Sequence, residues 1–180
     1  MATMILLPDG TGVASGDWIA VGESTRHEAL ESDDGNTSYV QCNDDNSYMI
    51  IGFANPDDVT AVNGGVVEAD IASIESVRFL SSGKSVDRTD ASFVDIAFEA
   101  PNSGFSESCL YLAHRTNYTS VNGTARTTDG THPWTYANLE ALEMRCTKDG
   151  TVNVYLSYLA LEVTYTELST SNAIFFGANF

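Results

Sequence analysis

The sequence predicts an all-β domain, an antiparallel two-sheet sandwich of the jelly-roll type with at most one short helix. Its apolar runs are short and separated by turn-rich segments, as in a sandwich or barrel. Several runs alternate apolar and polar residues with a period of two, the pattern of a half-buried strand. The 180 residues suit one domain with a sizeable core, so folding needs neither disulfides nor a metal.

Strand-like runs follow one another along most of the chain. They cover residues 4–7, 18–21, 38–42, 48–54, 66–80, 93–99, 109–114 and 152–166. We expect the first strand to end at Pro8-Asp9-Gly10, because these are turn residues. The run 66–80 also shows helical spacing at Ile71, Ile74 and Arg78. Its flanks carry turn residues and no helix cap, so a strand is the better interpretation.

The one helix candidate is 137–144. Leu139, Leu142 and Glu143 fit a helical face weakly, whereas Leu142, Met144 and Cys146 fit a strand. A short helical turn that runs into a strand reconciles both patterns.

The last long run, 152–166, changes parity in its middle. Its apolar positions are first Val152, Val154 and Leu156, and then Leu159, Leu161, Val163 and Tyr165. A period of two cannot change parity without an extra residue. The sequence therefore predicts a β-bulge or bend between Tyr155 and Tyr158.

The charge balance is strongly acidic. Eight lysines and arginines face 25 aspartates and glutamates, which gives a net charge of −17, and only Lys84 and Lys148 are lysines. Such a surface repels itself at ordinary ionic strength and is tolerated when salt screens it, which indicates adaptation to high salt. No basic patch is present to bind nucleic acid or an anionic membrane. We expect no signal peptide at residues 1–7 and no membrane span.

We expect no enzyme, because the motifs of nucleophilic catalysis and of phosphate binding are missing. The histidines His27, His114 and His132 lack metal-ligand spacing. Glu68 and Asp70 begin a pattern of sugar-cleaving sandwiches, but Ser73 stands where that pattern needs an acid. We interpret the two carboxylates as solvated strand residues.

Paired carboxylates are the candidates for a structural Ca²⁺ or for Na⁺ or K⁺. They are Asp33, Asp34, Asp44, Asp45, Asp57 and Asp58. None has the alternating spacing of a calcium loop, and turns use aspartate as well, so turns are favoured and no cofactor is expected.

The three cysteines, Cys42, Cys109 and Cys146, form no metal or disulfide framework and are interpreted as small buried side chains. One disulfide stays open as an alternative. Glycosylation sequons at Asn36, Asn117 and Asn122 predict surface loops.

Trp134 lies in a loop, 131–135, which a buried tryptophan would lock in place. The alternative is an exposed sugar-binding platform made of Trp134, Tyr136 and Tyr118.

Both ends of the chain are apolar. We divide the chain into an N-terminal strand or arm (1–16), a jelly-roll domain (17–168) and a phenylalanine-rich tail (169–180). The ends either complete this core or contact a neighbouring subunit. The candidate inter-subunit residues are Met4, Ile5, Leu6, Ile174, Phe175, Phe176 and Phe180.

Trp18, an acidic loop with a tyrosine strand (29–40), a Trp-Thr loop (129–135) and a closing run (158–165) occur in a familiar order. Over residues 17–166 this order resembles the small jelly-roll, concanavalin-like virion proteins of tailed phages and related archaeal viruses. With the acidic composition, the resemblance implies a capsid decoration or cement protein of a haloarchaeal tailed virus. The family has no shared catalytic residues to transfer.

The resemblance also implies partners and a location. The expected partners are the major capsid protein and copies of this chain in a homotrimer, on the outer surface of the capsid. The alternative role is a carbohydrate-binding receptor module of a tail, baseplate or turret, with host-surface glycans as ligands.

Overall fold

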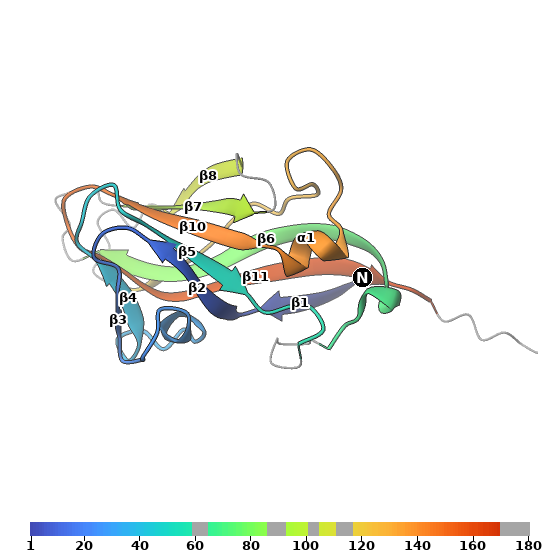
Figure 1. The fold of residues 1–180 in the computed structure, drawn as a ribbon, viewed down its shortest axis with the longest axis horizontal. Coiled ribbons are helices and arrows are strands. Elements are labelled where there is room, and N and C mark those ends of the chain that lie inside the picture. Colours follow the sequence, from blue (N-terminus) through green and yellow to red (C-terminus); the bar gives the residue numbers. More distant parts are fainter. Residues whose placement is uncertain (59–64, 86–92, 101–104, 111–116, 170–180) are drawn as a thin grey trace, which may run out of the picture.

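The computed structural model describes residues 1–58, 65–85, 93–100, 105–110 and 117–169 (Figure 1). The strands are β1 (Ala2–Leu6), β2 (Pro8–Ala14), β3 (Ile19–Val21), β4 (Tyr39–Cys42), β5 (Tyr48–Phe53), β6 (Ile71–Ser85), β7 (Phe93–Ala100), β8 (Phe105–Leu110), β9 (Thr119–Asn122), β10 (Glu143–Asp149) and β11 (Val154–Glu167). Two 3₁₀ turns, η1 (Glu28–Leu30) and η2 (Glu68–Asp70), and one α-helix, α1 (Tyr136–Glu140), complete the described elements. No described helix is long and apolar enough to cross a membrane.

The strands form two antiparallel sheets. The first has the order β3-β4-β11-β6-β9, and β1 also pairs with β11; the second has the order β2-β5-β10-β7-β8. The pairings are nested, because β7 pairs with β8, β6 with β9, β5 with β10 and β4 with β11. This is a long hairpin rolled up across two sheets, which is the jelly roll. The predicted fold class is therefore confirmed.

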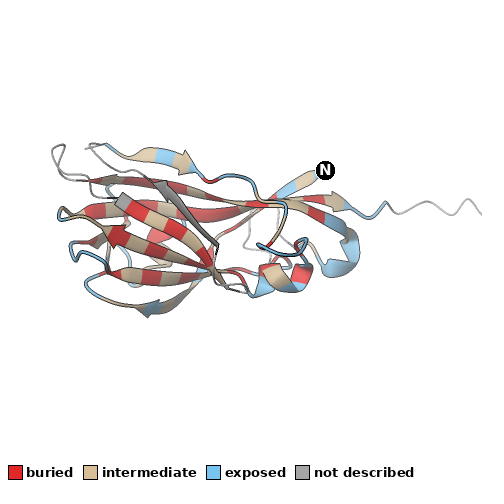
Figure 2. Ribbon diagram, turned by 90° about the horizontal axis from the view of Figure 1, so that it is seen from above, coloured by how far each residue is buried: buried red, intermediate tan, exposed pale blue. Residues whose placement is uncertain are grey.

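The core lies between the sheets and follows from the alternation in the sequence. Both β5 and β10 alternate partly exposed with buried residues along their whole length, as Figure 2 shows. Each sheet thus turns one apolar face inward, while the opposite parity faces solvent. The fully buried apolar residues include Val40, Met49, Ile51, Ile96, Met144, Leu156, Leu161 and Val163.

The predicted bulge is present in β11. Its register against β6 shifts between Leu156 and Tyr158, so that Ser157 is the extra residue. Val154 and Leu156 before the bulge and Leu159 after it are all fully buried. The bulge therefore lets both halves of the strand turn their apolar side chains toward the same core.

The first 14 residues are part of both sheets rather than an arm. β1 pairs with β11 and β2 pairs with β5. Met4 and Leu6 are fully buried in this chain's own core, so the prediction that they contact another subunit is wrong. Ile5 has the opposite parity and stays half-buried beside Glu162. The candidates Ile174, Phe175, Phe176 and Phe180 lie outside the described residues.

Three other expected boundaries change. Pro8 begins strand β2 instead of ending β1, because an edge strand tolerates a proline without an N–H donor. The run expected at 66–80 starts with the 3₁₀ turn η2 and continues as β6 to Ser85. The run expected at 109–114 overlaps the end of β8, and residues 111–116 lie outside the described part.

The predicted helical turn that runs into a strand is confirmed by α1 and β10. The side chain of Thr135 accepts a hydrogen bond from the backbone N–H of Asn138, and the Asn138 side chain accepts from the backbone N–H of Thr135. This capping box fixes the start of the helix. The helix ends within five residues, and Leu142 then turns inward.

The two described cysteines behave as the sequence predicts. Cys42 and Cys146 are buried free thiols, and burial raises the pKa of both, that of Cys146 to about 12. Since the thiolate is the reactive form, we expect iodoacetamide to modify neither residue in the folded protein. Peptide mapping after labelling checks this, with guanidinium-unfolded protein as the positive control. Fast labelling of either cysteine in native buffer would contradict the assigned burial.

The two lysines differ in their exposure to solvent. Lys148 lies on the inner face of β10, is fully buried, and donates from Nζ to the carbonyl oxygen of Gly150. Lys84 is half-buried on the outer face of β6. Of the two lysines, Lys148 therefore carries its charge inside the core, and Lys84 carries its charge at the described surface.

Candidate ligand-binding site

Four of the chain's eight tyrosines gather on the outer face of the first sheet. Together with one lysine we call them the tyrosine face: Tyr39, Tyr118, Tyr155, Tyr158 and Lys84. Tyr155 of β11 faces outward because Val154 and Leu156 on either side face the core. It pairs with Gln41 of β4 on one side and with Lys84 of β6 on the other. Strand register therefore brings residues far apart in the sequence into one row.

The rings and the ammonium group contact one another. Tyr39 and Tyr155 meet edge to face, with ring centroids 5.3 Å apart and planes at 68°. The Nζ atom of Lys84 lies 4.4 Å from the ring centroid of Tyr118 and 5.4 Å from that of Tyr155. Such cation–π contacts stabilise by about 0.5–2 kcal/mol. They hold the positive charge between two aromatic rings.

The acidic loop before β4 borders this face. Asp34 accepts hydrogen bonds from the backbone N–H and the hydroxyl of Ser38, each at 3.0 Å. Asp33 Oδ1 accepts from the hydroxyl of Ser157 at 3.1 Å, which ties the loop to the bulge. Gly35 lies against Tyr118, where an added Cβ would be 3.8 Å from the ring. The loop is therefore fixed beside the rings by its own carboxylates.

The hydroxyls of Tyr118 and Tyr158 stay protonated near neutral pH. Burial raises the pKa of Tyr118, and the neighbouring tyrosines and the charges of Asp34 and Asp33 raise it further. Burial and the charge of Asp33 raise the pKa of Tyr158 as well. Among the described residues the Tyr118 hydroxyl is buried and has no hydrogen-bond partner.

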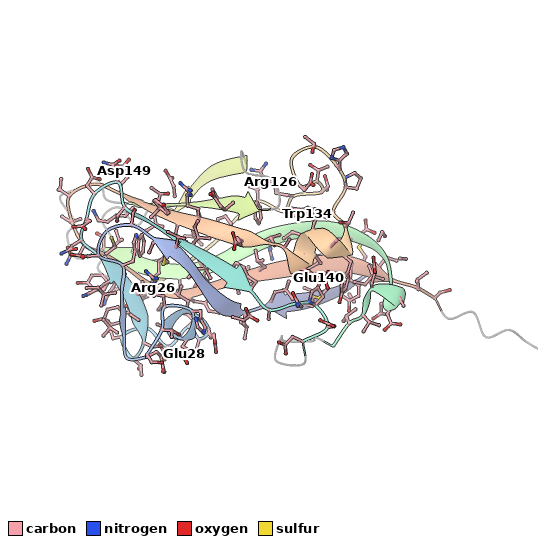
Figure 3. All side chains as sticks on the ribbon, viewed as in Figure 1. Arg26, Glu28, Arg126, Trp134, Glu140 and Asp149 are labelled. Atoms are coloured by element: carbon pink, nitrogen blue, oxygen red, sulfur yellow. The ribbon has the colours of Figure 1, made fainter. Side chains whose placement is uncertain are left out.

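Two of the three aromatic residues named for the alternative platform are buried. Trp134 is 6% exposed, packs on Phe98 with ring centroids 5.6 Å apart, and donates from Nε1 to the carbonyl oxygen of Arg126 (Figure 3). Tyr136 is 9% exposed and donates to the carbonyl oxygen of Val66 at 3.1 Å. The loop is locked by its tryptophan, as the favoured interpretation expected, and the alternative of an exposed platform is wrong for both rings.

Asp44 and Asp45 accept hydrogen bonds from backbone N–H groups, most of them in other loops. Asp44 accepts from the backbone N–H of Asp17, and Asp45 accepts from those of Asn46 and Gly150. Among the described residues, no three histidine, cysteine or carboxylate side chains are placed to hold a metal ion. Cation binding at these pairs, including Asp57 and Asp58, remains a prediction.

The remaining candidates are dispersed. Glu68 and Asp70 are exposed, as expected, but they lie in the turn η2 rather than in a strand. His132 is exposed and His27 is half-exposed, on separate loops, and His114 lies outside the described residues.

Sequence reasoning found only Tyr118 of the tyrosine face. The signal for the others was present as parity, because Tyr39, Tyr155 and Tyr158 occupy the outward positions of their strands. Parity gives the face of a sheet but not the neighbouring strand. The cluster depends on β4, β11 and β6 being neighbours, and on Tyr118 preceding β9, the next strand of that sheet.

No protein-family model matches this chain. No curated protein matches it either. Among solved structures, it is similar to a family 29 carbohydrate-binding module from Piromyces equi. That likeness has 12% identity and a TM-score of 0.36, and it covers 90% of this chain and 91% of that one. The sheet order of the chain itself defines an all-β jelly-roll sandwich domain, and its described surface carries an aromatic outer face.

Proposed function

We propose that this chain is a non-catalytic module that binds a sugar chain on its tyrosine face. The observation that carries the proposal is the clustering of four half-buried tyrosines on one outer sheet face. A tyrosine offers an apolar ring for the C–H groups of a sugar and a hydroxyl for its O–H groups. The rings and the loop beside them are held by mutual contacts, so binding would require little reordering.

The carboxylates beside this face favour binding over hydrolysis. Glycoside hydrolysis needs two acids aimed at one bond, one of them able to donate a proton. Asp33 and Asp34 instead accept hydrogen bonds from Ser157 and Ser38. Ser73 stands where the related pattern of sugar-cleaving sandwiches has its acid.

The test is binding of the purified protein to a glycan array in molar salt, with single substitutions. Tyr155→Ala and Tyr118→Ala should each weaken binding about tenfold, which corresponds to about 1.4 kcal/mol of lost contact. Tyr48→Ala is the matched control, because Tyr48 is a half-buried tyrosine on the outer face of the other sheet. The proposal fails if the wild-type protein binds no glycan, or if all three variants bind equally well.

A second candidate role concerns where the module is displayed. The acidic composition supports adaptation to salt. With the sequence resemblance to virion proteins, it supports a decoration subunit on the capsid of a halophilic tailed virus, bound to the major capsid protein and to its own copies. Copy number by mass spectrometry of purified virions tests this: hundreds of copies support decoration, and a few copies support a tail module.

A further inference from the structure

The tyrosine face contains a positive charge, the ammonium group of Lys84, in a chain that is strongly acidic. Two described arginines have acidic partners, since Arg78 pairs with Glu162 at 2.6 Å and Arg145 with Glu99 at 2.7 Å. Lys84 forms no ion pair among the described residues, although the chain carries a net charge of −17. Within the described part of the chain, a half-buried ammonium group without a carboxylate partner therefore lies in an aromatic cluster.

The hydrogen bonds of Lys84 leave room for a ligand. Its Nζ atom donates to the amide oxygen of Asn36, which is a neutral acceptor. An ammonium group has three donors, so two stay open among the described residues. Asp33 and Asp34 accept hydrogen bonds from Ser157 and Ser38, and neither forms an ion pair with Lys84 among the described residues.

We infer that the tyrosine face selects sugar chains that carry a carboxylate or sulfate group, and that Lys84 pairs with that group. The inference rests on the proposed sugar-binding function and gives it a substrate class. Charge-assisted hydrogen bonds to an anionic oxygen are about twice as strong as neutral ones. The rings of Tyr118 and Tyr155 hold the ammonium group in place, which reduces the ordering that a ligand must impose.

The net charge of −17 predicts how the affinity for an acidic glycan changes with salt concentration. At low ionic strength the whole protein repels an anionic polymer, because the screening length is about 30 Å at 0.01 M salt. At about 1 M it falls to roughly 3 Å, so long-range repulsion disappears while a direct contact at Lys84 is weakened less. Binding of an acidic glycan should therefore strengthen with salt, which is the opposite of a basic surface patch.

The experiment compares acidic and neutral polymers of matched backbone. Affinity gel electrophoresis and calorimetry are run with polygalacturonate and its methyl ester, and with alginate, heparin and galactomannan, at about 0.1 and 2 M NaCl. We expect at least one acidic polymer to bind about tenfold tighter than the neutral polymers at the higher salt. Lys84→Met should abolish that preference, whereas Lys84→Arg should retain it.

The outcomes separate this inference from the function on which it rests. A preference for neutral polymers, or an acidic preference that survives in Lys84→Met, overturns the role of Lys84 while sugar binding stands. Absence of binding to every polymer and to the glycan array overturns both. Unfolding temperatures of the two variants, measured in the same buffers, show that each comparison is made on folded protein.

Discussion

Deletion of Ser157 is expected to prevent the chain from forming a stable domain. Without the bulged residue, strand β11 has one parity, so either Val154 and Leu156 or the inward residues after the bulge must turn to the outer face. Exposing two buried aliphatic side chains costs about 3–6 kcal/mol. That loss is comparable with the whole stability of a typical domain, about 5–15 kcal/mol.

The matched control is Ser157→Ala, which keeps the bulge and removes only the hydrogen bond to Asp33. We expect this substitution to cost about 1 kcal/mol. Urea unfolding followed by tryptophan fluorescence measures both variants. A deletion variant with wild-type stability would show that the extra residue does not set the register.

Trp134→Ala is expected to destabilise the fold by about 3–5 kcal/mol, the usual cost of removing a buried aromatic side chain. The substitution removes the contact with Phe98 and the hydrogen bond to Arg126, which close the loop onto the second sheet. Trp134→Phe keeps most of the ring contact and loses the hydrogen bond, so a smaller loss of about 1–2 kcal/mol is expected. Denaturant titration of both variants measures the two losses of stability and checks that Trp134→Ala loses more than Trp134→Phe.

The same pair of variants separates stability from binding. Trp134 borders β6 near Ile74, whereas Lys84 lies ten residues further along that strand, about 33 Å away. Trp134→Phe should therefore bind glycans as the wild-type protein does. Weakened binding in this folded variant would indicate that the sugar site is at the tryptophan loop and not at the tyrosine face.

The sequence alone determined the fold class and the irregularity of the last strand, because both depend on local parity. Alternation in β5, β10 and β11 gives each strand an apolar side, and two such sheets must meet face to face. The change of parity in β11 required one extra residue, and Ser157 is that residue.

Pairing between distant strands was decided only by the tertiary structure. The sequence left open whether the apolar N-terminus completes this core or contacts a neighbouring subunit, whereas in the structure β1 pairs with β11 beyond β4 and buries Met4 and Leu6. The sequence favoured a buried Trp134 but could not name its partners, which are Phe98 and the carbonyl oxygen of Arg126. The alternation within a strand determines on which face of the sheet a side chain lies. Its neighbours on that face depend on which strands pair with its own.

The tyrosine face depends on such neighbours, so the sequence could not reveal it. Lys84 and Tyr155 are paired residues on adjacent strands, 71 positions apart in the chain, with Tyr118 beside them. Local patterns fixed which side chains face outward, and the rolled hairpin fixed which of them meet. The sheets are held by contacts between segments distant in sequence, and the proposed binding surface is built from the same contacts.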